Sequence, residues 1–162
     1  MTDSDLNRIE TELGIRLPFA YRQLVCPYPI ATYVGNGEVL AMSLWDSASE
    51  LIQLNLELRQ GYLCGLPWPH HYFALGRDGT GSAELIDLND VECRVIRADK
   101  CNIQSTEGAR ENSPCLKEWA DQYLEEVRTD LFERGIDEST PPVDRQLKED
   151  LDAKAGCRTV LF

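Results

Sequence analysis

The sequence has few of the features that membrane-spanning and nucleic-acid-binding proteins need. No apolar run among its 162 residues approaches the ~18 residues that a membrane-spanning helix requires. Basic residues are outnumbered, with 16 lysines and arginines against 28 aspartates and glutamates. The resulting net charge of −12 repels nucleic acid and membrane surfaces. We therefore expect neither a nucleic-acid partner nor a membrane partner.

Histidine and closely paired cysteines are also scarce. His70 and His71 are the only histidines, and adjacent residues on an extended segment point to opposite sides. None of the six cysteines forms a C-x-x-C pair or lies at a zinc-finger interval from a histidine. The opening residues, Met-Thr-Asp-Ser-Asp, have neither the basic start nor the apolar core of a signal peptide. These absences predict a cytoplasmic protein with reduced thiols and no cofactor or metal ion.

What is present is typical of a globular domain, with 43% hydrophobic and 27% charged residues. The length suits one domain with a real core. We place that domain over residues 1–134. Residues 135–162 follow as a C-terminal extension, which we expect to pack on the same domain. The acidity is spread through the domain and is not confined to a tail.

Two short helices are predicted at the N-terminus. Leu6, Ile9 and Leu13 lie on one face of the first helix, which ends at Gly14 because glycine takes the positive φ of a helix end without a Cβ clash. Pro18 is placed at the first position of the second helix, where its missing N–H costs nothing.

The middle of the chain alternates between turn signals and apolar segments. Ser47 and Glu50 form a capping box that begins a helix, and Gly61 ends it. Strands are predicted over 32–43, 72–77, 83–88 and 93–98, with a tight turn at Asp78-Gly79-Thr80-Gly81. The polar residues 99–114 are predicted to form a long loop.

A long amphipathic helix is predicted over residues 116–134. Its apolar face carries Leu116, Trp119, Ala120, Tyr123, Val127 and Leu131. Glu118, Asp121 and Glu125 fall on the opposite face. Helices at both ends and strands between them predict an α+β fold, in which helices cover an antiparallel or mixed central sheet.

Two segments resemble the SMI1/KNR4 family, also called the SUKH superfamily. The first is the helix, glycine stop, Leu17-Pro18 and second helix with the early Tyr21. The second is the strand, turn and strand over residues 72–88, which reads YFALGRDGTG and then ELIDL from Glu84. The resemblance implies an α+β fold over residues 1–134. It also implies an immunity protein that binds and neutralises a bacterial toxin without catalysing a reaction.

Two other functions remain open. The first is a regulatory or scaffold module that binds a cellular protein. The second is an enzyme with a cysteine or carboxylate site, which would need Cys64 or Cys93 to lie close to one of the two histidines. The Gly-rich turn lacks the following helix and the Lys-Ser/Thr pair of a phosphate loop.

The net charge favours a basic partner, for example a nuclease-like toxin domain built to meet phosphate. The candidate contact residues are the loop and helix acids together with two tryptophans, because exposed tryptophan is enriched at binding hot spots. They are Trp45, Asp46, Trp68, Asp78, Asp90, Glu92, Glu118, Asp121 and Glu125.

Overall fold

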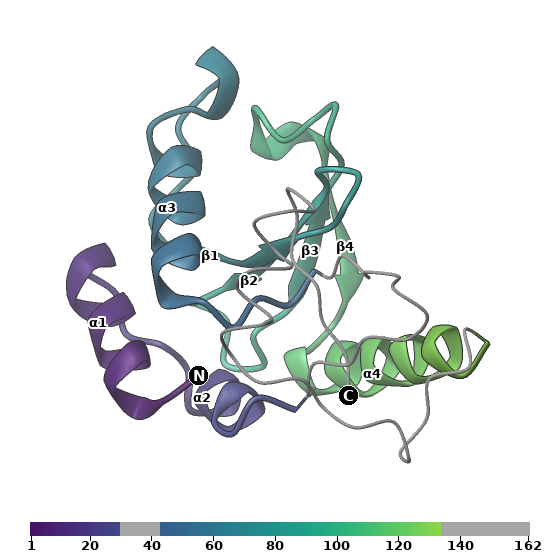
Figure 1. The fold of residues 1–162 in the computed structure, drawn as a ribbon. Coiled ribbons are helices and arrows are strands. Elements are labelled where there is room, and N and C mark those ends of the chain that lie inside the picture. Colours follow the sequence, from purple (N-terminus) through teal and green to yellow (C-terminus); the bar gives the residue numbers. More distant parts are fainter. Residues whose placement is uncertain (30–42, 134–162) are drawn as a thin grey trace.

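The computed structural model describes residues 1–29 and 43–133 (Figure 1). The helices in these ranges are α1 (Asp3–Leu13), α2 (Phe19–Val25), α3 (Ala48–Arg59) and α4 (Leu116–Glu133), with single-turn 3-10 helices at η1 (Tyr62–Cys64) and η2 (Thr106–Gly108). The strands are β1 (Tyr72–Arg77), β2 (Ala83–Asp87), β3 (Val95–Ala98) and β4 (Ala109–Ser113). Nearly all of the strand segment predicted over 32–43, and the extension over 135–162, lie outside the described residues.

The N-terminal helices begin and end at the predicted signals. Thr2 caps α1 in a reciprocal capping box with Asp5, and Gly14 ends the helix at φ +63°. Leu6, Ile9 and Leu13 are its buried residues, as predicted. Pro18 stands one position earlier than predicted, as the residue before α2 and not its first residue. Its φ of −59° still suits the entry to a helix.

The four strands form one antiparallel sheet in the order β1-β2-β3-β4. This confirms the α+β class and selects the antiparallel alternative. The register of β1 shifts between Ala74 and Gly76. A Cβ on Gly76 would lie 2.1 Å from the carbonyl oxygen of Ser43, so only glycine lets the two backbones approach so closely.

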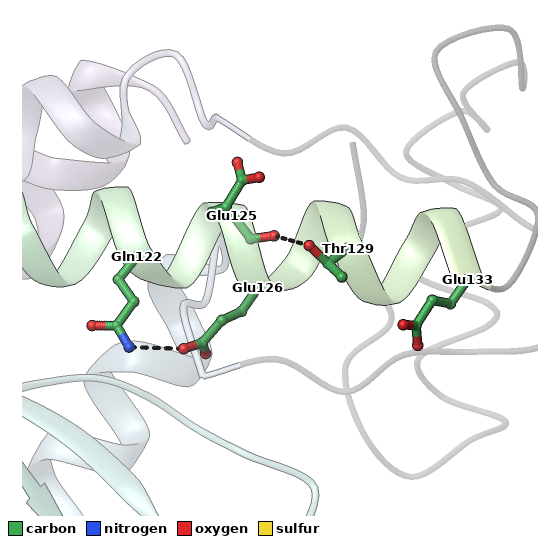
Figure 2. A pocket seen from close by; sticks show the side chains of 5 residues that line it. All are labelled: Gln122, Glu125, Glu126, Thr129 and Glu133. Atoms are coloured by element: carbon green, nitrogen blue, oxygen red, sulfur yellow. Dashed lines mark hydrogen bonds between the residues drawn. The ribbon is translucent and has the colours of Figure 1, made fainter.

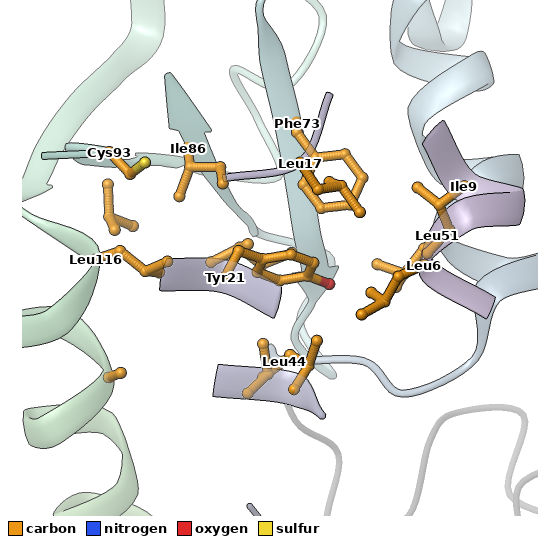
Figure 3. Packing of buried hydrophobic residues seen from close by; sticks show 14 of the residues in the cluster. Leu6, Ile9, Leu17, Tyr21, Leu44, Leu51, Phe73, Ile86, Cys93 and Leu116 are labelled. Atoms are coloured by element: carbon orange, nitrogen blue, oxygen red, sulfur yellow. The ribbon is translucent and has the colours of Figure 1, made fainter. Parts of the chain in front are cut away.

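Apolar clusters fill both faces of the sheet. Phe73 faces one cluster and its neighbour Ala74 the other, as the strand period of two requires. The larger cluster joins α1, α2, α4 and the sheet, and Tyr21 packs edge-to-face on Phe73 at 5.2 Å between ring centroids (Figure 3). On the β1 side, α3 supplies residues to both clusters, and its buried Asn55 exchanges hydrogen bonds with the backbone of Ala74.

The predicted loop over 99–114 was wrong in its last third, where the chain forms η2 and then β4. The sequence of β4, Ala-Arg-Glu-Asn-Ser, has no apolar alternation because Arg110, Glu111 and Asn112 are exposed at the sheet edge. Charged residues are common on edge strands. β3 also begins two residues later than predicted, since Cys93 has a left-handed backbone at φ +53°.

The long helix α4 buries the predicted face. Leu116, Trp119 and Ala120 are buried, and the rings of Trp119 and Tyr123 stack 4.8 Å apart. The phenol oxygen of Tyr123 accepts hydrogen bonds from the backbone N–H groups of Ser43 and Leu44. None of the described helices is both long and apolar enough to cross a membrane.

The turn between β1 and β2 gives a test of its glycines. Gly81 has φ +93°, whereas Gly79 is not among the glycines with positive φ, so the left-handed position is Gly81 alone. Gly81→Ala should cost about 1–2 kcal/mol of unfolding free energy, because a Cβ disfavours this region. Its Cβ would lie 3.5 Å from that of Lys100, so strain and not a clash sets the cost. Gly79→Ala is the matched control, and equal denaturation midpoints for the two variants would contradict this assignment.

Candidate partner-binding surface

The nine predicted contact residues lie in three separate places and do not form one surface. Trp45, Asp46 and Asp78 lie near the second half of β1, Trp68 lies in the core, Asp90 and Glu92 lie in the turn between β2 and β3, and Glu118, Asp121 and Glu125 lie on α4. The β1–β2 and β2–β3 turns are at opposite ends of β2. Asp78 and Asp90 are therefore separated by the length of that strand.

The prediction that Trp68 contacts a partner was wrong. Trp68 is only 2% exposed and belongs to the smaller apolar cluster. Its indole N–H donates to the carbonyl oxygen of Ile103 at 2.8 Å, which satisfies the polar end of the ring inside the protein. The two flanking prolines, which suggested a surface loop, lead the chain directly into β1.

Trp45 and Asp46 are half-buried beside β1. The backbone N–H of Trp45 donates to Leu75 O at 2.9 Å, and its indole N–H donates to Arg77 O at 3.2 Å. Trp45 thus seals the edge of the sheet above the bulge at Gly76. Both of its polar groups bond within the protein, so the ring is held by the fold.

Asp78 organises the β1–β2 turn. One carboxylate oxygen accepts from the backbone N–H groups of Thr80 and Ser82, and the other lies 2.7 Å from the guanidinium of Arg97. Burial alone would raise the pKa of Asp78, but these hydrogen bonds outweigh it and hold the pKa below its usual value. Asp78 is therefore a structural acid more than a free surface charge.

Arg97 also binds a second, deeply buried acid. The Glu84 side chain on β2 is 3% exposed and accepts from Arg97 at 2.7 Å and from Asn112 at 3.1 Å. Burial raises the pKa of Glu84 despite these partners. We call Asp78, Glu84, Arg97 and Asn112 the Arg97 cluster. It ties β2, β3, β4 and the first turn together, and sequence reasoning did not find it.

The β2–β3 turn holds Asp90 and Glu92 in a fixed frame. Asp90 accepts from the backbone N–H of Glu92 and pairs with Arg94 at 3.2 Å. The carbonyl oxygen of Glu92 accepts from the N–H of Leu116, the first residue of α4, at 3.1 Å. The structure therefore brings this acidic turn against the start of the acidic helix, a proximity that the sequence separation of more than 20 residues conceals.

The outer face of α4 is strongly acidic. The helix carries six acids and two bases, and Glu118, Asp121 and Glu125 are exposed, as predicted. Asp121 pairs with Lys117, and Glu125 pairs weakly with Arg128 at 3.5 Å. Further along, a shallow hollow on α4 is lined, among the described residues, by Gln122, Glu125, Glu126, Thr129 and Glu133 (Figure 2).

The exposed acids Glu126 and Glu133 were missing from the predicted contact residues. Both belong to α4, and the 3.6-residue period that placed Glu118 and Glu125 on the outer face could have placed them as well. None of the ion pairs among the described residues includes Glu118, Glu126 or Glu133. We call Asp90, Glu92, Glu118, Asp121, Glu125 and Glu126 the acidic face.

The side chains considered for catalysis lie apart from such a frame. His70 is exposed, and the ring of His71 lies against Tyr72 at 4.4 Å between centroids. Burial, followed by the nearby acids Asp90, Asp87 and Glu92, raises the pKa of the Cys93 thiol, which disfavours the nucleophilic thiolate. Over residues 1–29 and 43–133, no three His, Cys, Asp or Glu side chains are grouped as a metal site needs.

Comparison with known proteins adds no assignment. A scan against protein-family models finds no match for this chain, and a search of curated proteins finds none either. The resemblance to the SMI1/KNR4 family therefore stays a prediction from the two quoted segments.

Proposed function

We propose that this protein is a non-enzymatic immunity protein that binds a cognate toxin domain and neutralises it by covering its active surface. The observation that carries the proposal is the acidic face, in which the β2–β3 turn adjoins a helix with six acids and two bases. The resemblance to the SMI1/KNR4 family supports the same reading. A regulatory or scaffold protein would use this face too and would differ only in the partner it binds.

The chemistry of the face suits a basic partner. A nuclease-like domain carries positive charge where it binds phosphate, and carboxylates spaced along a helix can occupy the same positions. Opposite charge speeds the diffusional encounter and excludes wrongly charged partners more than it adds affinity. Covering the phosphate-binding surface would block the toxin without any chemical step.

The acidic face is also rigid enough to bind without large ordering costs. The turn is held by Arg94 and by its hydrogen bond to α4, and α4 is anchored through the buried ring of Trp119. Side chains on a regular helix are held more precisely than those on a loop. Less conformational entropy is then lost when the complex forms.

The test is the association rate with the toxin domain encoded beside this gene. Reversing Glu125 and Glu126 to lysine should slow association roughly 10-fold or more at low salt, since steering of this kind changes rates by that amount. The rate should also fall steeply as salt shortens the Debye length to ~8 Å at physiological ionic strength. Stopped-flow mixing with fluorescence detection measures both effects.

Two control variants make the comparison specific. Glu107 and Glu12 are exposed acids on η2 and α1, outside the acidic face, and reversing both to lysine changes the net charge by the same amount. That variant should slow association much less. If the two double variants behaved alike, or if salt left the rate unchanged, the acidic face would not be the contact. If the toxin domain did not bind at all, the immunity function would be wrong.

A further inference from the structure

A second surface stands out because it is apolar and uncharged. Residues 61–67, which we call the leucine loop, follow α3 and contain η1. Leu63 and Leu66 are 69% and 68% exposed, an unusual state for two large apolar side chains so close together. They lie in the longest uncharged stretch of the chain, the 17 residues from 60 to 76, within a protein whose net charge is −12.

The leucine loop is held rigidly in a strained backbone. Leu63 and Cys64 both have left-handed conformations, with φ +50° and +64°. Non-glycine residues adopt such conformations only where the surrounding structure fixes them, and they cluster at functional sites. Here a hydrogen bond from Leu66 N–H to Gln104 O fixes the loop at 2.8 Å. Gly65 packs so closely on Gln104 that a Cβ would lie 2.4 Å away.

The leucine loop lies away from the acidic face. Figure 1 places the turn after α3 at the top of the molecule and α4 at the bottom. A contact through the loop would therefore leave the acidic face open for the toxin. The loop also plays no part in the function proposed above, so it can be tested independently.

We propose that the leucine loop is a self-association site, through which two copies of this chain form a weak two-fold dimer. The charge pattern favours a second copy as the occupant. Two chains of charge −12 repel one another at most approaches, and an uncharged apolar loop is where they can meet with the least repulsion. In a two-fold contact the same patch serves both partners, so Leu63 of each copy meets the leucines of the other.

The small size of the patch sets the expected affinity. Two leucines per copy bury far less than the ~800 Å² per partner of a standard interface. The dimer should therefore form only at high concentration, with a dissociation constant of about 0.1–1 mM. Salt should strengthen it, because screening weakens the repulsion between the two acidic chains. This is the opposite of the salt effect expected for the toxin complex.

Sedimentation equilibrium of the purified protein, from about 10 µM to about 1 mM at low and high salt, tests the proposal over the expected range. We expect the mean mass to rise with concentration toward that of a dimer, and to rise further at high salt. A monomer mass under every condition would overturn the proposal.

The variants separate the loop from apolar exposure in general. Leu63→Asn and Leu66→Asn together should abolish the dimer without unfolding the chain, because asparagine tolerates the left-handed backbone of position 63. Phe19→Asn is the matched control, since Phe19 is 73% exposed on α2 and its replacement also removes apolar surface without adding charge. A dimer that survives the loop substitutions, or that is weakened equally by Phe19→Asn, would overturn the proposal.

Discussion

Arg97→Met is expected to destabilise the protein by about 2–4 kcal/mol, because it leaves the buried carboxylate of Glu84 without its counter-charge. Methionine keeps the aliphatic length of the arginine stem and removes only the guanidinium group. Glu84 would retain the hydrogen bond from Asn112 but would lose the guanidinium contact at 2.7 Å. The value lies toward the low side of the cost of breaking a buried pair, because the Arg97 side chain is 35% exposed and water reaches it.

The pH dependence of this loss distinguishes it from a packing defect. The raised pKa of Glu84 means that its stabilising contribution is complete below the unfolded pKa and is lost as pH rises through the folded pKa. Asp78 behaves in the opposite way, because its folded pKa is lowered and its contribution disappears as pH falls through that value. Without Arg97 the pKa values of both carboxyl groups should rise.

The stability deficit of Arg97→Met should therefore be largest near neutral pH and should shrink toward pH ~4, where Glu84 becomes protonated. Urea denaturation at several pH values measures it. Arg110→Met is the matched control, because Arg110 is exposed on β4 directly across from Arg97 in the strand register. It should change stability by at most about 0.5 kcal/mol, as for most surface substitutions. A deficit that is equal for the two variants, or constant with pH, would contradict the role given to the cluster.

The Arg97 cluster also shows where sequence reasoning stopped. The hairpin of β1 and β2 was predicted from apolar runs around a glycine turn, and both strands were found where expected. Nothing in those runs shows that Glu84, an acid inside an apolar strand, meets Arg97 on the next strand. Such a pairing depends on register, which is set by turns and by the burial of whole faces.

The same limit explains the errors at β4 and Trp68. A strand at a sheet edge exposes most of its side chains, so Arg110, Glu111 and Asn112 carry no apolar period. Trp68 lies between prolines, and its burial depends on a loop 35 residues later that supplies the acceptor at Ile103. Local patterns predict elements, whereas long-range contacts decide which side chains they cover.

The candidate surface was predictable in its helical part alone. The 3.6-residue period placed Glu118, Asp121 and Glu125 on the solvent side of α4, because the opposite face is continuous and apolar. The period could not show that the β2–β3 turn adjoins the helix, which follows from the hydrogen bond between Glu92 and Leu116. It also could not show that Asp78 belongs to a different end of the sheet.

Trp119→Ala is expected to destabilise the protein by about 3–5 kcal/mol, as large-to-small substitutions in a core do. Trp119 is 5% exposed, and its ring stacks on Tyr123 with an interplanar angle of 7°. Removing the ring loses its transfer free energy, leaves a cavity between α4 and the sheet, and frees Tyr123 to tilt. Because Tyr123 accepts hydrogen bonds from Ser43 and Leu44, the loss should spread to the segment that leads into α3.

The neighbouring position supplies the control. Glu118 precedes Trp119 on the same turn of α4 but is exposed, so Glu118→Ala should change stability by at most about 0.5 kcal/mol. The free energies from urea denaturation should therefore differ by several kcal/mol between two adjacent alanine substitutions. The Glu118→Ala variant should also remain folded while losing one charge of the acidic face, so it can be used directly in the association experiment. If both variants melted at the same temperature, α4 would be held by other contacts, and the rigid frame assigned to the acidic face would be lost with it.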